Sequence, residues 1–318
     1  MNNMSIALIV SNFGSFSPFF PFWLKSAEAN TNLCFFFLTD NLQAIKKYDH
    51  CKNIHFIYFR EVDFSKRVKD ALGLDLFLKN PKKICDFRVA YGVLFSDLLK
   101  SFDFWGFCDT DVIFGNTSCF LTPDKLRYYD RIYRYGHFSL IKNTEENNHF
   151  YKKLHTDEGD DFVKVFSSDR IYCYEERIFC QKLQEDGKRV YVNDSDLADI
   201  NRFLYRFYTH KKTSYGQRHF FLEWQKGDLW AVSKVSGQWK KTRIMYAHFQ
   251  KRRIDICCDS LSDDLVIVPN RIIDGFGLSD QAKWKLASKT NFCYSAGKLI
   301  RGVYCRFCNH VFHTDKPY

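Results

Sequence analysis

The chain has 318 residues, of which 46% are hydrophobic, which suffices for one large domain or for one domain with a small appendage. Its longest apolar runs are too short to span a membrane, and the apolar stretch Ser5–Val10 lacks the features of a signal peptide, so we expect a cytoplasmic protein. The formal net charge of +10 suits an anionic partner, namely a nucleotide diphosphate, an anionic lipid or a nucleic acid, although a basic surface can also serve solubility alone. The twelve cysteines are scattered through apolar stretches, which predicts free thiols rather than disulfides.

The N-terminal part of the chain alternates between strand-like and helix-like patterns. Strands are expected at Ile6–Val10, Leu33–Leu38 and Ile54–Phe59, and helices at Phe22–Ala29, Phe64–Ala71 and Tyr91–Lys100. Because strands that alternate with helices form parallel sheets, the expected fold class is α/β, with a mostly parallel sheet flanked by helices.

A fourth expected strand, Phe104–Cys108, is apolar along its whole length, as in a strand buried at the centre of a sheet. Asp109 and Asp111 follow it directly. Open α/β sheets bind their ligands beyond the C-terminal ends of the strands. The two acids therefore stand where a ligand site is expected.

The rest of the chain is less regular and predicts mixed α/β structure. Two aromatic strands flank Lys226–Asp228, which indicates a hairpin, and Ile244–Phe249 has the pattern of another strand. A soft boundary near Arg253–Asp264 divides an expected domain of residues 1–255 from a basic, aromatic extension of residues 256–318.

The pair Asp109 and Asp111 has the spacing of a site for a divalent cation. Two carboxylates separated by one residue can place oxygens near one hard cation such as Mn²⁺ or Mg²⁺, which keeps positions open for substrate phosphates. By itself the motif is common, and a solvated turn explains many examples. Here the acids interrupt an apolar segment, and buried carboxylates need a partner such as a cation.

His248 lies in an apolar strand and is followed closely by three cations at positions 251–253. A neutral imidazole could serve as a third metal ligand while Lys251 or Arg252 contacts a diphosphate. The alternative is a hydrogen-bonded core histidine beside a solvated basic turn.

Asp86 and Arg88 precede the helix that leads to the acidic strand. This pair could bind the hydroxyls or phosphates of a donor, or it could form a structural ion pair. The residues alone leave both alternatives open.

Four segments together resemble a family of bacterial glycosyltransferases of the GT-A fold that occur in capsule and O-antigen gene clusters. The segments are Lys83–Gly92, Phe104–Gly115, Gly136–Ser139 and Tyr246–Arg252, in that order. The resemblance implies that Asp109 and Asp111 bind the metal, that His248 is a late ligand, and that Asp86 and Arg88 lie near the donor sugar or its phosphates. One departure is Val89, where the family pattern has proline.

The same resemblance implies contacts for the two substrates. The nucleoside of the donor would lie over the first strands, which makes Ser11, Asn12, Phe13, Thr39 and Asp40 candidates for base and ribose contacts. Glu175 and Glu176 stand where an acceptor-site acid is expected, with Asp169 as a further candidate, because an inverting enzyme needs a base for the attacking hydroxyl. Both glutamates could instead belong to the exposed face of a helix that runs to Leu183, and the stereochemistry stays open.

The C-terminal segment Lys289–His313 mixes aromatic and basic residues, which suits an anionic membrane surface and an acceptor such as a lipid-linked oligosaccharide. Cys305 and Cys308 have the spacing of half a zinc site, but a second cysteine pair is missing nearby, so structural zinc is not expected.

The function expected from these features is a metal-dependent glycosyltransferase that moves a sugar from a nucleotide-diphosphate donor, such as a UDP-sugar, to a saccharide of a bacterial surface polysaccharide. A nucleotidyl- or phosphotransferase could use the same acidic pair, but it should carry a phosphate-binding loop after the first strand, and Ser11–Gly14 contains none. A basic nucleic-acid-binding protein is the third alternative, and no known motif supports it.

Overall fold

The computed structural model describes residues 4–76, 78–200, 206–209, 219–250, 254–260 and 262–288. The chain forms two compact units. One comprises Met1–Val112 with Thr117–Asn193, and the other comprises Ile113–Asn116 with Asp194–Tyr318. Each unit has its own sheets and its own core.

The first unit is built on a seven-stranded sheet with the order β3-β2-β1-β4-β7-β6-β8. Its strands are β1 (Ile6–Ser11), β2 (Cys34–Thr39), β3 (Ile54–Tyr58), β4 (Phe104–Cys108), β6 (Arg131–Tyr135), β7 (Phe138–Lys142) and β8 (Val190–Tyr191). The four strands β3, β2, β1 and β4 run parallel, β7 runs antiparallel to both β4 and β6, and β8 is parallel to β6. The expected α/β class with a mostly parallel sheet is thereby confirmed.

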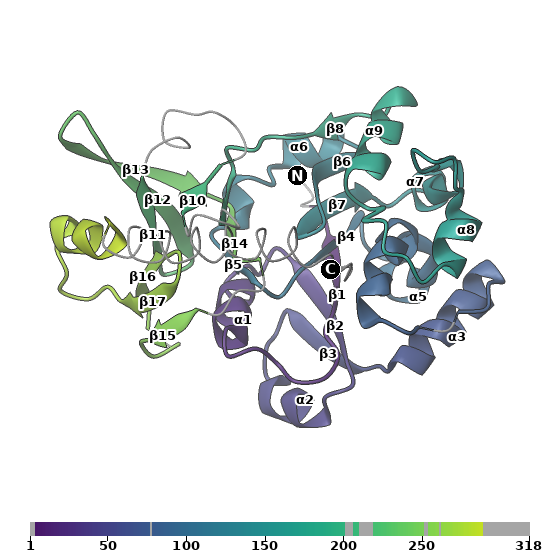
Figure 1. Ribbon diagram of the computed structural model, residues 1–318, viewed down its shortest axis with the longest axis horizontal. Coiled ribbons are helices and arrows are strands. Elements are labelled where there is room, and N and C mark those ends of the chain that lie inside the picture. The colour runs from purple at the N-terminus through teal and green to yellow at the C-terminus, as the bar shows by residue number, and fades with distance from the viewer. Residues whose placement is uncertain are drawn as a thin grey trace, which may run out of the picture. The chain divides into compact units, whose positions relative to one another are not determined.

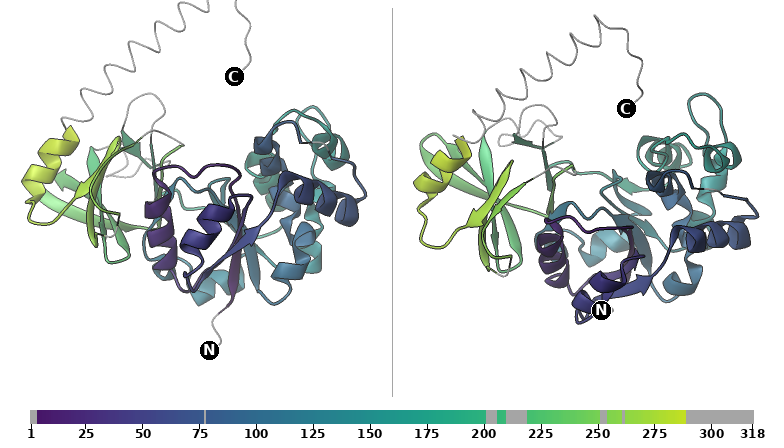
Figure 2. Two further views of the ribbon diagram at one scale, coloured as in Figure 1. Left: turned by 90° about the horizontal axis from the view of Figure 1, so that it is seen from below. Right: turned by 60° about the horizontal axis from the view of Figure 1, so that its bottom comes forward.

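Helices cover both faces of this sheet: α1 and α2 lie on one face, and α3, α5 and α8 lie on the other (Figures 1 and 2). The helices are α1 (Phe20–Glu28), α2 (Leu42–Tyr48), α3 (Glu61–Leu72), α4 (Tyr91–Leu94), α5 (Ser96–Leu99), α6 (Pro123–Tyr128), α7 (Glu145–Asn148), α8 (Phe162–Ser167) and α9 (Arg177–Glu185); short 3-10 segments are η1 (Pro81–Ala90), η2 (Thr117–Cys119) and η3 (Phe150–Lys153). Side chains alternate between the two faces of the sheet along β2, so each face receives apolar rings. Phe35 and Phe37 contact Trp23 of α1, whereas Phe36 contacts Phe102.

Two helices can be compared with the expected pattern. Helix α3 begins three residues before the expected start at Phe64 and ends, as expected, just before Gly73, whose φ of 71° lies in the left-handed region that glycine tolerates. The expected helix over residues 91–100 is divided into α4 and α5 at Phe95, whose φ of −119° is not helical. The Phe95 ring is fully buried against Tyr91, so packing outweighs helical continuity at this point.

The second unit contains a four-stranded sheet, β10-β9-β14-β5, and a six-stranded sheet, β13-β12-β11-β16-β17-β15. The strands are β5 (Val112–Phe114), β9 (Leu197–Ile200), β10 (Phe207–Tyr208), β11 (Phe220–Gln225), β12 (Asp228–Val235), β13 (Gln238–Ile244), β14 (Tyr246–His248), β15 (Asp255–Cys257), β16 (Asp264–Val268) and β17 (Arg271–Asp274). The hairpin expected at residues 226–228 joins β11 to β12, and Lys226 and Gly227 both have positive φ, as tight hairpins require. The expected strand Ile244–Phe249 is divided between β13 and β14, which belong to different sheets.

The division between the compact units does not coincide with the boundary expected at residue 255. Strands on both sides of residue 255 share the six-stranded sheet, since β11 pairs with β16. Residues 280–288 form a helix whose Trp284 and Ala287 pack on the same sheet, against a core that includes Phe221 and Val232. Residues 256–288 therefore pack as part of the second unit.

Two expectations about the whole chain can be compared with the described residues. None of the helices in the described ranges combines the length and the apolar character that crossing a bilayer requires. All nine cysteines in those ranges carry free thiols, as the sequence predicts.

Candidate functional site

The parallel strands β1, β2 and β4 end at the same edge of the first unit's sheet. The residues expected to contact the nucleoside end or follow β1 and β2, and Asp109 follows β4. Asn12 is tied to this edge because its backbone N–H donates to Leu38 O at 3.0 Å, while its buried side-chain amide nitrogen has no hydrogen-bond partner among the described residues. Asp40 is exposed and accepts a hydrogen bond from Gly14 N at 2.7 Å.

The remaining candidates for nucleoside contacts differ in how exposed they are to a ligand. Thr39 is fully buried, and its hydroxyl oxygen accepts a hydrogen bond from Asn41 N at 3.2 Å. Ser11 and Phe13 are both half-buried at the end of β1. The topology thus brings all five candidates to the edge that carries the acidic pair, and Thr39 alone is fully enclosed.

Arg88 is the centre of a buried polar cluster at this edge. Its Nη2 donates to Asp109 Oδ1 at 2.6 Å and its Nη1 donates to Gly136 O at 2.7 Å. Nη1 also lies 3.6 Å from Glu175 Oε1, and the guanidinium stacks 5.1 Å over the ring of Phe107. Burial alone would lower the pKa of Arg88, but the charges of Asp109 and Glu175 raise it well above its ordinary value.

Asp109 and Asp111 interrupt a buried apolar run, as the sequence predicts. Cys108 and Val112 on either side are buried, and Asp111 itself is only 8% exposed. The backbone N–H of Asp109 donates to His137 O at 3.2 Å, which fixes the start of the acidic loop. A carboxylate has two oxygens, so Asp109 can pair with Arg88 through one and hold a cation through the other. The two carboxylates supply anionic oxygen donors, which fit Mg²⁺ or Mn²⁺.

Glu175 is buried, with 3% of its surface exposed, so the alternative that places it on an exposed helix face is wrong. Helix α9 begins after both glutamates, at Arg177. Burial raises the pKa of Glu175 to about 8, and Arg88 opposes this rise. Its Oε2 has no hydrogen-bond partner among the described residues. A carboxyl group with this pKa is mostly protonated at neutral pH.

Glu176 is partly exposed, and its Oε1 accepts a hydrogen bond from the backbone N–H of Gly136 at 2.9 Å. Gly136 has no room for a side chain, because a Cβ there would lie 2.8 Å from Glu175 Oε1, 3.0 Å from Glu176 Oε1 and 3.3 Å from Arg88 Nη1. This close approach explains a glycine in the segment Gly136–Ser139 that the sequence analysis singled out.

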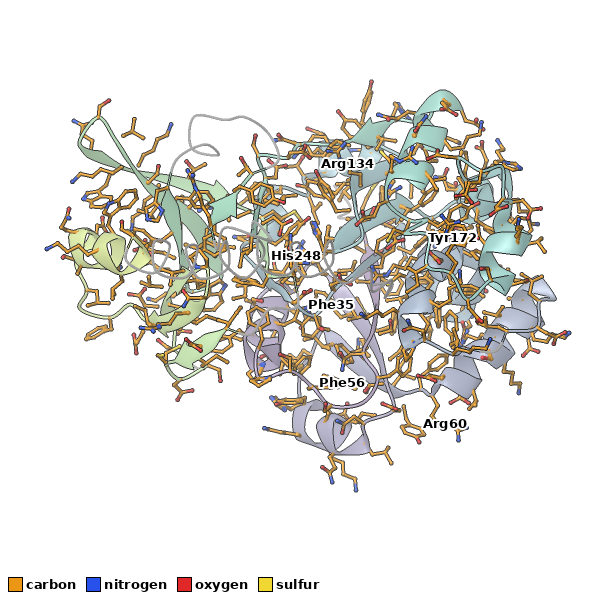
Figure 3. The ribbon with its side chains drawn as sticks, viewed as in Figure 1. Phe35, Phe56, Arg60, Arg134, Tyr172 and His248 are labelled. Atoms are coloured by element: carbon orange, nitrogen blue, oxygen red, sulfur yellow. The ribbon has the colours of Figure 1, made fainter. Side chains whose placement is uncertain are left out.

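Asp86 does not pair with Arg88. It is fully buried and accepts hydrogen bonds from Lys83 Nζ at 2.8 Å, from Tyr172 N at 3.1 Å and from Tyr174 N at 3.2 Å (Tyr172 is labelled in Figure 3). These bonds hold the segment that leads into Glu175. The ion pair between Asp86 and Arg88 that the sequence left open is therefore not formed, because Asp86 pairs with Lys83 and Arg88 pairs with Asp109.

Asp169 lies at the surface, with 57% of its side chain exposed, and pairs with Lys79 at 2.5 Å. Asp169 and Lys79 line a cavity of about 250 Å³ whose lining includes neither Arg88 nor Asp109.

In the second unit, His248 Nδ1 lies 3.1 Å from Asp199 Oδ1, and Gln250 Nε2 donates to the same oxygen at 3.1 Å. Asp199 is 4% exposed and stands opposite His248 in the parallel pair of β9 and β14. A carboxylate on one ring nitrogen orients an imidazole and favours ligation through the other nitrogen. Lys251 and Arg252 lie outside the described residues.

Sequence reasoning missed two charged residues of this architecture, Asp199 and Arg131. Arg131 is fully buried, and its Nη2 donates to Glu175 O at 2.7 Å while its Nε donates to Ser139 Oγ at 2.9 Å. Burial lowers the pKa of Arg131 to about 10. The signal that could have found Asp199 is a single charge inside the apolar strand Leu197–Ile200; Arg131 begins a strand that contains a second arginine and gives no such signal.

The raised pKa of Glu175 has a consequence for stability. A raised folded-state pKa contributes stability that is complete below the ordinary value of 4.5 and is lost as the pH rises through about 8. We expect Glu175→Gln to remove this contribution, which has a slope of at most about 1.4 kcal/mol per pH unit. Urea unfolding at several pH values measures it, with the exposed Glu185→Gln as control. Equal pH slopes for the wild type and Glu175→Gln would contradict the expectation.

The fold and the site define an α/β protein with a polar, acidic cluster at the carboxyl edge of a largely parallel sheet. The chain belongs to the Family of unknown function (DUF6625), whose model matches residues 8–275. The sequence matches none of the curated proteins.

Several solved structures are similar to part of the chain. The apo form of mouse xyloside xylosyltransferase 1 is 8% identical with a TM-score of 0.44, covering 63% of this chain and 88% of that one. The apo form of glycosyltransferase GlyE from Streptococcus pneumoniae TIGR4 is 10% identical with a TM-score of 0.35, covering 60% of this chain and 46% of that one. The galactosyltransferase LgtC in complex with donor and acceptor sugar analogs is 13% identical with a TM-score of 0.38, covering 61% of this chain and 75% of that one.

Proposed function

We propose that this protein is a metal-dependent glycosyltransferase of the GT-A type that uses a nucleotide-diphosphate sugar, such as a UDP-sugar. The observation that carries the proposal is the acidic pair Asp109 and Asp111 at the end of the central strand β4, with Arg88 holding Asp109. Ligand sites of open α/β sheets lie at this edge. The proposal assigns the acidic pair to Mn²⁺ or Mg²⁺.

Each residue of the cluster has a distinct part in this proposal. The bound cation would draw negative charge from the leaving diphosphate as a Lewis acid. Arg88 orients the Asp109 carboxylate, because its guanidinium is itself fixed by Gly136 O and by stacking on Phe107. Asn12 and Asp40, at the ends of the neighbouring strands, are proposed to contact the nucleoside of the donor.

His248 is proposed as the third metal ligand and Lys251 as a contact to the diphosphate. The support for His248 is its orientation by Asp199, an arrangement typical of metal-ligating histidines. Lys251 rests on its place among the cations that follow His248 in the sequence.

The transfer joins the oxygen of an acceptor hydroxyl to the anomeric carbon of the donor sugar, and the bond from that carbon to the diphosphate breaks. The hydroxyl proton needs an acceptor if the configuration is inverted, and Glu175 and Glu176 are the proposed candidates, since Glu176 accepts a hydrogen bond from Gly136 N and Glu175 lies 3.6 Å from Arg88. Of the two, Glu176 is the accessible one. Asp169 stays a third candidate without a described contact to this cluster.

The acceptor is proposed to be a saccharide of a bacterial surface polysaccharide, of the capsule or O-antigen kind that the sequence motifs imply. A lipid-linked oligosaccharide would place the reaction at the cytoplasmic face of a membrane. The basic segment Lys289–His313, which would contact that surface, lies outside the described residues.

A thermal-shift experiment tests the proposal. The donors are UDP-glucose, UDP-galactose and UDP-N-acetylglucosamine, and we expect one of them to raise the melting temperature in the presence of Mn²⁺. At a hundredfold excess over its Kd, a bound donor adds about 2.7 kcal/mol to the free energy of unfolding. The same donor with EDTA should have little effect. A melting temperature that ignores all three donors with and without Mn²⁺, together with no release of UDP, would refute the proposal.

A further inference from the structure

A cavity of about 310 Å³ lies between the turn that connects β6 to β7 and the helix α9. We call it the α9 pocket, and its lining residues are Arg134, Tyr135, Glu176, Arg177, Cys180, Gln181 and Gln184 (Arg134 is labelled in Figure 3). Its volume is at the lower end of the ~300–1,000 Å³ typical of small-molecule sites. All of its lining residues belong to the first unit.

Three consecutive residues connect this pocket with the acidic loop. Tyr135 lines the pocket, Gly136 bonds to Arg88 and Glu176, and His137 O accepts the backbone N–H of Asp109. The ring of Tyr135 stacks on that of His137, with centroids 5.0 Å apart. The turn therefore contacts both the acidic loop and the pocket.

Glu176 belongs to both environments. Its Oε1 is held by Gly136 N at 2.9 Å, and the same side chain lines the pocket. Glu175, in contrast, is buried and does not line the pocket. A ligand in the α9 pocket could thus reach the Glu176 carboxylate without any change in the buried cluster around Arg88.

The helix α9 presents one face to this pocket. Residues 177, 180, 181 and 184 are spaced as neighbours on a helix surface, so two side-chain amides lie along it. Gln181 and Gln184 are exposed, and both can donate and accept hydrogen bonds. Together with the carboxylate of Glu176, they match the needs of a ligand that carries many hydroxyl groups.

We infer that the α9 pocket binds a sugar ring of the acceptor saccharide, with its reacting hydroxyl hydrogen-bonded to Glu176. The inference rests on the proposed function, since it names the substrate class and the place of the second substrate of that reaction. Arg134 and Tyr135 form one wall, where the Arg134 guanidinium lies 5.0 Å over the tyrosine ring and donates to the tyrosine hydroxyl at 2.9 Å. Gln181 and Gln184 line the pocket from α9.

Acceptor kinetics test this inference. The full chain, with Mn²⁺ and a hydrolysable UDP-sugar, is assayed for release of UDP and for disaccharide, with the methyl glycosides of glucose, galactose, N-acetylglucosamine and rhamnose as probes. We expect one glycoside to give disaccharide. Gln181→Ala and Gln184→Ala should each raise its KM about 3- to 10-fold, because each removes one hydrogen bond to the sugar.

Gln184→Trp should fill the pocket and abolish disaccharide formation, while transfer to water still releases UDP. Gln43→Ala, an exposed glutamine on α2, serves as the matched control and should leave the KM unchanged. Melting curves show whether a variant folds. If Gln184→Trp does not fold, the KM of Gln181→Ala decides whether the acceptor binds in the α9 pocket.

The failures of the two proposals differ in their readouts. If no UDP-sugar is hydrolysed or bound with Mn²⁺, the proposed function itself fails. If UDP is released but none of the four glycosides changes that rate or forms product, the saccharide assignment of the α9 pocket is overturned. If product forms with the same KM in Gln181→Ala and Gln184→Ala as in Gln43→Ala, the acceptor binds elsewhere.

Discussion

Replacement of Asp111 by asparagine is expected to lower Mn²⁺-dependent turnover of the nucleotide sugar by at least about 100-fold. Loss of residues that merely orient metal ligands costs ~10–100-fold, so the loss of a ligand should cost no less. Asparagine keeps the size of the side chain and removes its charge, which isolates the electrostatic contribution. Steady-state release of UDP measures the rate, and titration with Mn²⁺ separates weaker metal binding from slower turnover.

The matched control for this experiment is Asp124→Asn. The side chain of Asp124 is 96% exposed and pairs only weakly with Arg127 at the surface, so its loss should leave both the rate and the Mn²⁺ dependence unchanged. If Asp111→Asn retained full Mn²⁺-dependent turnover, the assignment of the acidic pair to the metal would be wrong.

Replacement of Arg88 by alanine is expected to lower both stability and activity. At pH 7 we expect a loss of about 3 kcal/mol in the free energy of unfolding, at the low end of the ~3–5 kcal/mol for a broken buried ion pair, because Glu175 is largely protonated there. The variant also leaves Asp109 without its orienting partner, which should lower turnover ~10–100-fold. Urea unfolding and UDP release measure the two effects.

The loss of stability in Arg88→Ala should increase with pH. The charge of Arg88 lowers the pKa of Glu175, so removal of that charge raises the pKa further and makes ionisation of this buried carboxyl group more costly. We therefore expect a larger difference from the wild type at pH 9 than at pH 6. Arg170→Ala is the control, since its pair with Glu158 is about 60% exposed on both sides and should contribute ~0–1 kcal/mol. Equal stabilities of the two variants at both pH values would contradict the central place of Arg88.

The charged residues around Gly136 are connected by hydrogen bonds. Arg88 joins the acidic loop to Gly136, Gly136 joins Arg88 to Glu176, and Arg131 fixes the backbone of Glu175. Because the links are hydrogen bonds between buried or partly buried groups, a change at one of them should alter the others more than its own contact energy suggests.

The sequence by itself determined the features that depend on neighbouring residues. Strand β4 occupies the residues expected of it, and β1 and β3 differ from expectation only at their ends, because short apolar runs bounded by turns carry a strong local pattern. The position of Asp109 and Asp111 at a strand end follows from the same pattern. The hairpin at Lys226 and Gly227 follows from turn chemistry.

The partners of the charged side chains were decided only by the tertiary structure. Residues 81–90 form a 3-10 helix, in which side chains three apart are eclipsed, so Asp86 faces Lys83 and not Arg88, two residues away. Arg88 instead reaches Asp109 and Gly136, which are 21 and 48 residues distant along the chain. Glu175 is buried whereas the adjacent Glu176 is partly exposed. This difference in exposure likewise depends on tertiary contacts, in which Glu175 meets Arg88 and Arg131. Spacing along a sequence records local geometry, whereas these pairs form because separate strands and loops meet at one edge of a sheet.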